Sequence, residues 1–475
     1  TTYDYMDEVG QYVWAESINN VTSQSTPTNL SMRIRSVKEV EETSIYKSYL
    51  VRGDGGTSAA GSKLEWQLRV RVYHHSPAVR LQSTLTFHWD PNLYALASAK
   101  LNVVLEGSRL SNINVPGVNK SISLANVVHI KSTREGASSL VRGSTTYSKS
   151  DYPNDKLHAS VVKGENGMFL GVGVQNLTQL GPNHVKASKY SVDIAQWSEL
   201  SGRVLDLRRS VKDDEPGIEA GDRKMDAKGL SRTMRITLSF TSSEKAAKAI
   251  AQTESLRENI WLPNQRDVVT TQALGPMNMD IIKNNPTYFE GLAANNRFFL
   301  SERDKWRWNG FINFGDFRTN LSGSRWKMLG RYGWRGGSAN VYGSMLNGGL
   351  YLEDRKTVLG ALDYAYHVAD VDVRHGSYYG AAYSDTGGMH RRNKNHWSGM
   401  TQAQYSPTPG LYLAQSLTND ERIDEVLVEA RSYHKKYGSA STDPAATWIS
   451  HYAKTQDPKD LDLAMSLLES NSKAY

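Results

Sequence analysis

The chain has 475 residues, enough for two or three domains of ordinary size, and this length excludes a single small binding module. Hydrophobic residues make up 39% of the sequence and charged residues 22%, a composition typical of a folded globular protein and unlike that of a disordered chain. Lysine plus arginine (56) exceeds aspartate plus glutamate (49) by seven. Such a surplus would suit an anionic partner if it were concentrated in one region.

The sequence contains no cysteine, which excludes disulfides, thiol nucleophiles and thiolate metal sites. This absence fits export by a bacterium, so we expect a secreted or periplasmic protein, with a cytosolic location as the alternative. No run of 18 apolar residues occurs, and no membrane span is expected. The chain begins at Thr1 with neither an initiator methionine nor a signal peptide, which indicates a processed or trimmed chain.

Residues 1–245 show the period-two hydrophobic pattern of β-strands. Leu64, Trp66 and Leu68 alternate with polar residues, and a second alternating run follows a His-His-Ser-Pro-Ala turn. We count at least ten candidate strands, enough for stacked antiparallel sheets. The sequence therefore predicts an N-terminal β domain over residues 1–92 and a β-sandwich domain over residues 93–245.

The pattern changes at Ser242, where capping residues precede an alanine-rich helix-forming segment. Three later segments each contain a helix, a short polar turn with an aspartate and a second helix, namely residues 342–367, 411–430 and 448–468. Repeated αα-hairpins indicate a helical array, and we predict an (α/α) toroid-like catalytic domain over residues 246–475. Three hairpins are too few to close a ring, so either the array is open or the chain stops before the last hairpins.

Residues that carry chemistry gather between positions 288 and 405, where 21 of the 45 aromatic residues lie in Gly- and Asn-rich sequence. Long irregular loops in a compact domain are usually functional. Exposed Trp and Tyr beside Arg, Asn and Asp would suit a sugar, whose ring faces stack on aromatic rings while its hydroxyls form hydrogen bonds. Core packing is the alternative for each tryptophan. Residues 301–400 also hold 14 Lys and Arg against nine Asp and Glu, which accounts for five of the seven surplus charges.

Three histidines, His375, His390 and His396, fall within 22 residues of this loop-rich sequence. Their neighbours Arg374, Arg391 and Arg392 favour a functional cluster. His367 lies on a predicted helix and is expected to be a core residue with its hydrogen bonds satisfied. The strand histidines His74, His75 and His88 are expected to be structural or at the surface.

A metal site is a rival use of His375, Asp385, His390 and His396. Their spacing matches no compact zinc pattern, and the neighbouring Arg391-Arg392 would repel a cation. We therefore predict no metal ligands and no cofactor, although a structural calcium ion stays open. The sequence has neither a phosphate-binding glycine loop nor a nucleic-acid-binding module, so no nucleic-acid partner is expected.

Several short motifs together resemble the exo-acting rhamnogalacturonan lyase-like family of polysaccharide lyases. They are Arg69-Val70-Arg71-Val72-Tyr73, Ser76-Pro77-Ala78-Val79-Arg80-Leu81, Asn313-Phe314-Gly315-Asp316, Asp370-Val371-Asp372-Val373-Arg374-His375, Gly387-Gly388-Met389-His390 and His396-Trp397. The resemblance extends over most of the chain. It implies β-sandwich domains joined to an (α/α) toroid, and cleavage of uronic-acid polysaccharides by β-elimination. Related lyases act on ulvan, and the dense basic run at residues 391–395 favours ulvan over rhamnogalacturonan as the anionic substrate.

β-Elimination needs a group that offsets the uronate charge, a base for the C5 proton and an acid for the leaving O4. Arg supplies a bidentate carboxylate clamp, and a nearby cation lowers the pKa of a tyrosine. We predict His390 as base or charge neutraliser and Tyr379 or Tyr383 as proton donor. The other predicted catalytic residues are Arg374, His375 and His396, and the predicted substrate-binding residues are Trp308, Asn313, Asp316, Trp334, Arg335, Arg391, Arg392 and Trp397.

Two other functions stay open at this stage. A toroidal glycoside hydrolase would use paired carboxylates, for which Asp316, Asp372 and Asp385 are the candidates. A non-catalytic carbohydrate-binding protein would bind the same polysaccharide without turnover. The sequence leaves the oligomeric state undetermined.

Overall fold

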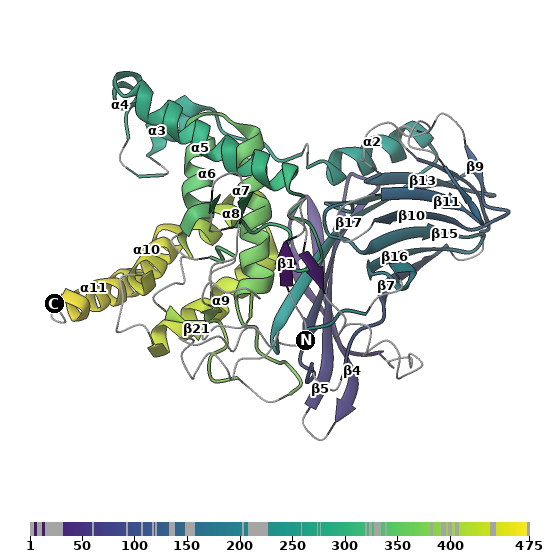
Figure 1. The fold of residues 1–475 in the computed structure, drawn as a ribbon, viewed down its shortest axis with the longest axis horizontal. Coiled ribbons are helices and arrows are strands. Elements are labelled where there is room, and N and C mark those ends of the chain that lie inside the picture. Colours follow the sequence, from purple (N-terminus) through teal and green to yellow (C-terminus); the bar gives the residue numbers. More distant parts are fainter. Residues whose placement is uncertain are drawn as a thin grey trace.

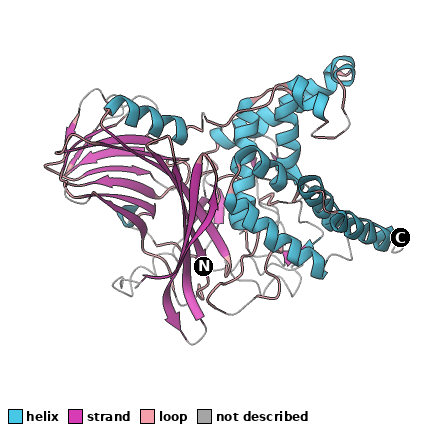
Figure 2. Ribbon diagram, turned by 180° about the vertical axis from the view of Figure 1, so that it is seen from behind, coloured by secondary structure: helices cyan, strands magenta, loops and turns pink. Residues whose placement is uncertain are grey.

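A computed structural model of the chain shows strands and helices on two sides of one molecule (Figures 1 and 2). The structure describes residues 4–6, 12–14, 32–58, 61–91, 94–105, 108–115, 118, 121–132, 138–147, 157–201, 204–207, 227–257, 259–272, 274–275, 277–318, 321–322, 325–326, 334–337, 340–380, 383–390, 396–397, 401–403, 408–437 and 443–472. Among these residues, no helix is both long enough and apolar enough to cross a membrane.

The larger sheet is antiparallel and has nine strands. Their order is β3 (Met32–Glu42), β4 (Tyr46–Ser58), β5 (Gly61–Tyr73), β6 (Ala78–Phe87), β17 (Leu230–Thr241), β14 (Phe169–Val174), β13 (Ala159–Gly164), β8 (Leu110–Asn114) and β9 (Ile122–Ser123). The predicted boundary at residues 92/93 does not separate two sheets, because β6 pairs along its length with β17. The chain leaves the sheet after β6 and returns to it more than once, which local sequence pattern does not reveal.

A second antiparallel sheet packs against part of the first. Its order is β12 (Thr145–Thr146), β11 (Ser138–Arg142), β10 (Val128–Ser132), β15 (Asn183–Ala187), β16 (Ser191–Trp197) and β7 (Ala99–Val104). One hydrophobic core holds Ile130 and Ile194 from this sheet together with Val172 and Ile236 from the larger one. Burial of these alternating apolar side chains is the driving force for stacking two sheets.

Helix α2 (Glu244–Ser255) covers the larger sheet rather than joining the other helices (Figure 1). Ser243 caps its first turn by accepting a hydrogen bond from the backbone of Ala246, as the sequence predicts. Glycine is required on the facing strand, since a Cβ at Gly171 would lie 2.5 Å from the carbonyl oxygen of Ala247. The helix can therefore approach the sheet closely.

The remaining helices form the second part of the molecule. They are α3 (Gln265–Thr271), α4 (Met279–Asn284), α5 (Pro286–Lys305), α6 (Val341–Tyr351), α7 (Arg355–His367), α8 (Pro409–Thr418), α9 (Glu421–Tyr437), α10 (Asp443–Thr455) and α11 (Pro458–Ser472). The three predicted αα-hairpins are confirmed as α6–α7, α8–α9 and α10–α11. Asp354 caps α7 and Asp420 caps α9 through their carboxylates, which explains the aspartate in these turns.

Short elements complete the described chain. The strand pairs are β1 (Asp4–Met6) with β2 (Tyr12–Trp14), β18 (Leu321–Ser322) with β19 (Arg325–Trp326), and β20 (Met389–His390) with β21 (Thr401–Gln402), and a 3-10 turn η1 spans Glu199–Ser201. A π-helical turn, η5 (Val368–Asp372), follows α7 directly. The architecture is thus mixed, with antiparallel sheets joined to a helical part.

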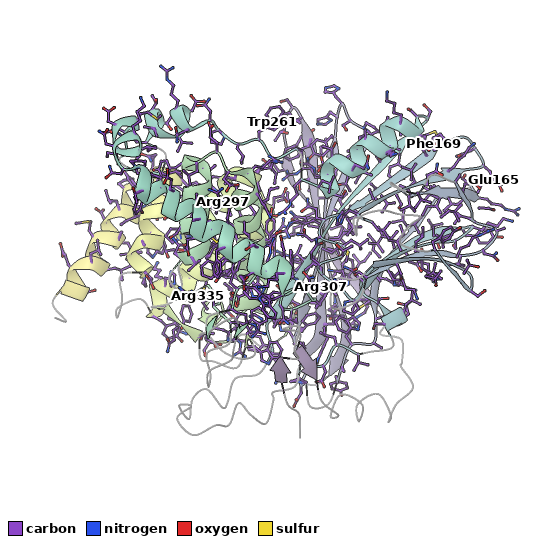
Figure 3. The ribbon with its side chains drawn as sticks, turned by 45° about the horizontal axis from the view of Figure 1, so that its top comes forward. Glu165, Phe169, Trp261, Arg297, Arg307 and Arg335 are labelled. Atoms are coloured by element: carbon purple, nitrogen blue, oxygen red, sulfur yellow. The ribbon has the colours of Figure 1, made fainter. Side chains whose placement is uncertain are left out.

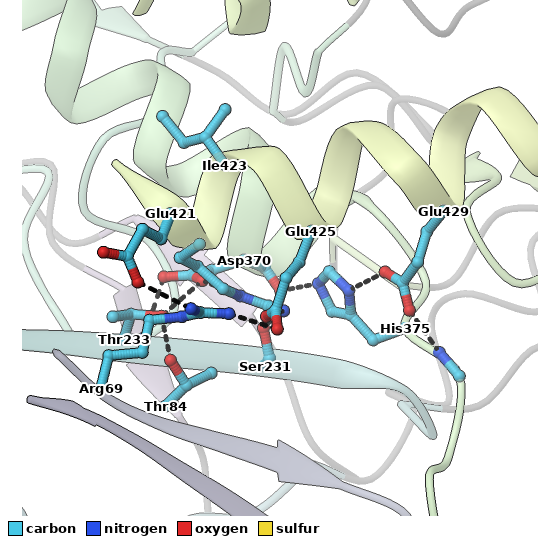
Figure 4. A network of polar contacts seen from close by, with 12 residues as sticks. Arg69, Thr84, Ser231, Thr233, Asp370, His375, Glu421, Ile423, Glu425 and Glu429 are labelled. Atoms are coloured by element: carbon cyan, nitrogen blue, oxygen red, sulfur yellow. Dashed lines mark hydrogen bonds and ion pairs between the residues drawn. The ribbon is translucent and has the colours of Figure 1, made fainter. Parts of the chain in front are cut away.

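The first turn of α9 docks onto strands β4 and β5 through buried charges (Figure 4). The Glu421 carboxylate accepts hydrogen bonds from Ser48 Oγ at 2.9 Å, Arg69 Nη1 at 2.9 Å and Arg71 Nη2 at 2.5 Å. Burial alone would raise the pKa of Glu421, but the hydrogen bonds from Arg71 and Ser48 outweigh it and the pKa is lowered. Glu421 is therefore charged at neutral pH and joins the two parts of the molecule.

We predict that Glu421→Gln lowers the free energy of unfolding by about 2–3 kcal/mol, because it removes the carboxylate that Arg71 pairs with. Asp424→Asn is the matched control on the same helix. Asp424 pairs with the exposed Lys454, so its loss should cost less than about 1 kcal/mol. A carboxyl with a lowered folded-state pKa contributes stability above its unfolded pKa and loses it as pH falls. Denaturant unfolding at several pH values should therefore show that the difference in free energy of unfolding between wild type and Glu421→Gln becomes smaller in acid. A difference that stays constant with pH would contradict this account.

Candidate active site

The segment from Arg374 to His390 is fastened to both parts of the molecule. Its backbone pairs with itself, through Arg374 N–H to Gly388 O at 2.9 Å and Gly387 N–H to Arg374 O at 2.8 Å. His375 N–H also donates to Gly229 O, at the start of β17. Gly387 has a positive φ of 83°, and a Cβ there would overlap the carbonyl oxygen of Glu429 on α9. The glycine predicted as part of the family motif therefore lets the loop lie against α9.

Tyr383 lies beside a histidine that comes from the sheet. His88 Nδ1 is 3.0 Å from the Tyr383 hydroxyl oxygen, and the two rings are 5.7 Å apart between centroids. His88 Nε2 is 3.6 Å from Glu65 Oε2, close enough for charge attraction although longer than a hydrogen bond. Glu65, His88 and Tyr383 therefore form a row of an acid, an imidazole and a phenol.

Glu65 is ionised and held firmly. Its carboxylate accepts hydrogen bonds from Ser377 Oγ at 2.5 Å, Tyr378 N–H at 2.9 Å and Tyr379 N–H at 3.0 Å. Burial would raise the pKa of Glu65, but its interactions with His88 and Ser377 lower it overall. An ionised Glu65 favours a proton on the facing Nε2 of His88. The Nδ1 of His88 can then accept the hydroxyl proton of Tyr383.

Arg374 completes this group. Its guanidinium carbon lies 4.5 Å from the centre of the Tyr383 ring, and its Nη1 is 3.2 Å from Asp385 Oδ2. Asp385 also accepts a hydrogen bond from Thr401 Oγ1 at 3.0 Å. A cation over the ring stabilises a phenolate, while His88 can take up or return its proton. We call Glu65, His88, Arg374 and Tyr383 the tyrosine site.

The predicted site residues Arg374 and Tyr383 are thus brought together, whereas others are not. Within the described part of the chain, Tyr379 meets the group through its backbone N–H, and its ring centre lies 5.7 Å from the guanidinium carbon of Arg35. His390 is buried in β20, opposite Thr401 of β21. His375 is held between the Glu429 carboxylate and the backbone carbonyl of Asp370 (Figure 4). Its two ring nitrogens are therefore engaged in structural contacts.

The three tryptophans predicted to bind substrate lie inside the protein. Trp308, Trp334 and Trp397 are only 3%, 2% and 3% exposed. Trp308 packs edge-on against Phe317, and Trp334 lies between His396 and the guanidinium of Arg318. The expectation that these rings are exposed is wrong, because they fill the cores of the helical part and of its contact with the sheets. Core packing, the stated alternative, is what the structure shows.

Two predicted arginines, Arg391 and Arg392, lie outside the described residues. Arg335 is half-buried, and Figure 3 labels it on the helical part of the molecule. The amide oxygen of Asn313 is 3.2 Å from His396 Nε2, so this predicted pair does come together.

Asp316 and His396 belong to a second, fully buried group with His367 and Asp372. His396 Nδ1 is 3.2 Å from His367 Nε2 and 3.4 Å from Asp316 Oδ2. Burial lowers the pKa of His367 to about 4, while burial and repulsion from Asp316 raise the pKa of Asp372 to about 7. His367 is confirmed as a core residue. We call these four residues the His/Asp cluster.

Sequence reasoning missed His88 and Glu65. Each lies in or beside a strand, where alternation with apolar neighbours such as Leu64 and Phe87 indicates only which face is buried. The link from His88 to Tyr383 spans 295 positions, so no local pattern could have shown it.

Comparisons with known proteins give little that bears on this site. No family model matches the chain, and no curated protein is significantly similar to it. One structural match is a putative aldose 1-epimerase from Klebsiella pneumoniae subsp. pneumoniae MGH 78578, which is 11% identical in sequence. The alignment covers 45% of this chain and 57% of the epimerase, and its TM-score is 0.24. An alpha-galactosidase from Lactobacillus brevis has 10% identity, coverage of 56% and 30%, and a TM-score of 0.24.

A third match is the galactosidase domain of an alpha-galactosidase-sucrose kinase, with 11% identity, coverage of 45% of this chain and 28% of that one, and a TM-score of 0.23. The chain thus aligns with less than two thirds of each of these proteins. Similarity this low establishes neither a shared fold nor a shared function. The functional argument therefore depends on the residues themselves.

Gly315 provides a test of how the His/Asp cluster is positioned. Its φ is +109°, and a Cβ there would lie 2.5 Å from Asp363 O and 2.6 Å from His367 Cβ. We predict that Gly315→Ala lowers the free energy of unfolding by about 1–3 kcal/mol from backbone strain, with overlap adding to this. Gly291→Ala is the control, because Gly291 lies in α5 with open space around it and alanine favours a helix. Thermal unfolding should give a lower melting temperature for Gly315→Ala than for Gly291→Ala. Equal melting temperatures would contradict the prediction.

Proposed function

We propose that this protein is a polysaccharide lyase that cleaves an acidic, uronate- and rhamnose-containing polysaccharide by β-elimination. Ulvan is the favoured substrate and rhamnogalacturonan the next. The observation that carries the proposal is the Tyr383 hydroxyl, which meets His88 at 3.0 Å under the guanidinium of Arg374. The resemblance to exo-acting rhamnogalacturonan lyases, the cationic region of the sequence and this phenol–imidazole pair agree with one another.

The reaction removes the C5 proton of a uronate, forms the C4–C5 double bond and breaks the bond from C4 to the glycosidic oxygen. In our proposal Tyr383 gives its proton to that leaving oxygen, and Arg374 offsets the negative charge that develops on the phenol. His88 exchanges protons with Tyr383, and Glu65 fixes the orientation of the imidazole. His390, predicted as the base at C5, is buried in β20 and is not among the residues of the tyrosine site, so the proposal rests on the proton donor and on the charge-neutralising arginine.

The proposal has implications for the whole protein. It implies that the two stacked sheets form a β-sandwich and that the hairpins belong to an (α/α) toroid. It also implies a secreted or periplasmic enzyme, since the polymeric substrate lies outside the cell.

The acids named for a hydrolase are less well suited to their role. Asp316 and Asp372 are buried and face two imidazoles, with their ligand atoms within 4.8 Å of each other. Asp385 is paired with Arg374. A lyase therefore uses the described residues better than a hydrolase does.

The proposal is tested by incubating the purified chain with ulvan, rhamnogalacturonan, alginate and glycosaminoglycans. A lyase product contains an unsaturated uronate that absorbs in the ultraviolet, and we expect this absorbance with ulvan or rhamnogalacturonan. New reducing ends without the absorbance would indicate a hydrolase. Binding without any product would indicate a carbohydrate-binding protein. Either outcome would overturn the proposal.

On the active substrate, we predict that Tyr383→Phe lowers kcat by about 100-fold or more with little change in KM, because only proton transfer is lost. Tyr437→Phe is the matched control. Its hydroxyl donates to Ser384 O in the same loop, at 3.1 Å, but takes no part in the tyrosine site. Tyr379→Phe distinguishes the two predicted donors, and a larger loss there than at Tyr383 would move the role to Tyr379. Initial rates of ultraviolet absorbance give kcat and KM for each variant.

A further inference from the structure

We propose that the His/Asp cluster is a binding site for one divalent zinc ion, held by Asp316, His367, Asp372 and His396 as a closed structural centre. The inference stands apart from the proposed lyase activity. It rests on geometry, burial and hydrogen bonding around the four side chains.

The four residues come from separate segments that meet inside the helical part. Asp316 follows α5, His367 ends α7, Asp372 ends the π-helical turn η5, and His396 lies between β20 and β21. Their side chains are at most 2% exposed. A bond from each to one ion would join four segments that are otherwise linked by loops.

The ligand atoms have the spacing of a small tetrahedron. His367 Nε2 lies 3.2 Å from His396 Nδ1, 3.4 Å from Asp372 Oδ1 and 3.8 Å from Asp316 Oδ2. His396 Nδ1 lies 3.4 Å from Asp316 Oδ2 and 3.7 Å from Asp372 Oδ1. Ligands about 2.0–2.2 Å from a central zinc ion would be about 3.3–3.6 Å apart in a regular tetrahedron. These five distances are therefore close to those of a zinc site, and the sixth, between the Asp316 and Asp372 oxygens, is at most 4.8 Å.

Both imidazoles are oriented with a lone pair toward the centre. The Nδ1 of His367 is 3.2 Å from the backbone carbonyl of Phe314, which can only accept, so Nδ1 carries the hydrogen. The Nε2 of His396 is likewise 3.2 Å from the amide oxygen of Asn313. The two inward nitrogens then face each other at 3.2 Å as acceptors, a contact that becomes favourable when either a shared proton or a metal cation lies between them. Metal-binding histidines characteristically give their outer N–H to such an acceptor.

The carboxylates point to the same conclusion. Asp316 Oδ1 accepts from Phe317 N–H at 2.6 Å and its Oδ2 from Gly336 N–H at 2.9 Å, which fixes the direction of the group. Asp372 is 1% exposed, and its Oδ2 has no hydrogen-bond partner among the described residues. A buried carboxylate oxygen without a donor is costly, and an ion bound to that carboxyl would offset the cost. Two carboxylates and two neutral imidazoles also balance one divalent charge.

Zinc fits this donor set better than the calcium left open by the sequence. Calcium takes six to eight oxygen ligands at longer distances, whereas imidazole nitrogens with four-fold coordination favour zinc. The prediction of no metal ligands considered His375, Asp385, His390 and His396. Of these four residues, only His396 belongs to the His/Asp cluster. The other three ligands are separated from it by 24 to 80 positions, so no compact spacing pattern could have revealed them.

The first experiment measures the metal content of the purified full-length chain after treatment with a chelator and return of one metal at a time. We expect one zinc ion per chain to survive desalting, with a higher melting temperature than the chelated protein. Cobalt(II) in place of zinc should give the intense visible absorption of tetrahedral coordination. A chain that retains no zinc and gives only the weak spectrum of hydrated cobalt would overturn the proposal. It would show that the cluster is a hydrogen-bonded network with a shared proton. Retention of another first-row metal in preference to zinc would overturn the zinc assignment.

Variants separate binding from folding. Asp372→Asn and His396→Gln should lose stoichiometric zinc. Asn313→Ala keeps all four ligands and should weaken zinc binding by about 10–100-fold, because it removes only the acceptor that orients His396. His451→Gln is the control, since His451 pairs with Asp460 on α10 and α11 away from the cluster, and it should bind zinc normally. Equal zinc affinity in all four variants would contradict the assignment. Metal content needs no substrate, so failure of the lyase proposal would leave this result unaffected.

Discussion

The buried carboxylate of Asp370 is the contact on which both sites depend. It accepts hydrogen bonds from the backbone and the hydroxyl of Thr233 on β17, at 2.9 and 2.8 Å, and so fastens η5 to the larger sheet. Burial would raise the pKa of Asp370, but Arg422 and Arg235 outweigh it, and the group stays ionised. One charged side chain therefore joins the helical part to the strands at the point where the chain leaves α7.

The residues on either side of this contact explain the positions of the two sites. His367 and Asp372 lie on either side of Asp370 in the sequence and belong to the buried His/Asp cluster. Arg374 lies two positions after Asp372, in the loop whose Tyr383 meets His88. The wider π-helical turn ends with a hydrogen bond from Val373 N–H to Val368 O, after which the chain is extended. Such turns add one residue to a helical turn and often occur at functional sites. Here the turn lets nearby residues serve a buried cluster and the loop of the candidate active site.

Much of the secondary structure follows from the sequence, and the candidate active site follows only in part. The αα-hairpins were predictable because their aspartates cap the helices that follow, as Asp354 does for Thr357. The alternation at Leu64, Trp66 and Leu68 was sufficient to predict a strand, but not that this strand shares one sheet with β17. Arg374 and Tyr383 were predicted as site residues, and the structure brings them together. Their partner His88 looked like an ordinary strand residue.

The sequence by itself determined the local elements, the mixture of strands and helices, and the stretch in which basic and aromatic residues gather. Those features depend on periodicity, capping and composition, which are properties of neighbouring residues. Only the tertiary structure decided that Trp334 is buried against His396, that His367 faces two carboxylates, and that Glu421 docks on Ser48 across 373 positions. These contacts depend on how sheets and helices pack, because burial makes an unpaired charge costly and so selects partners that are distant in the chain.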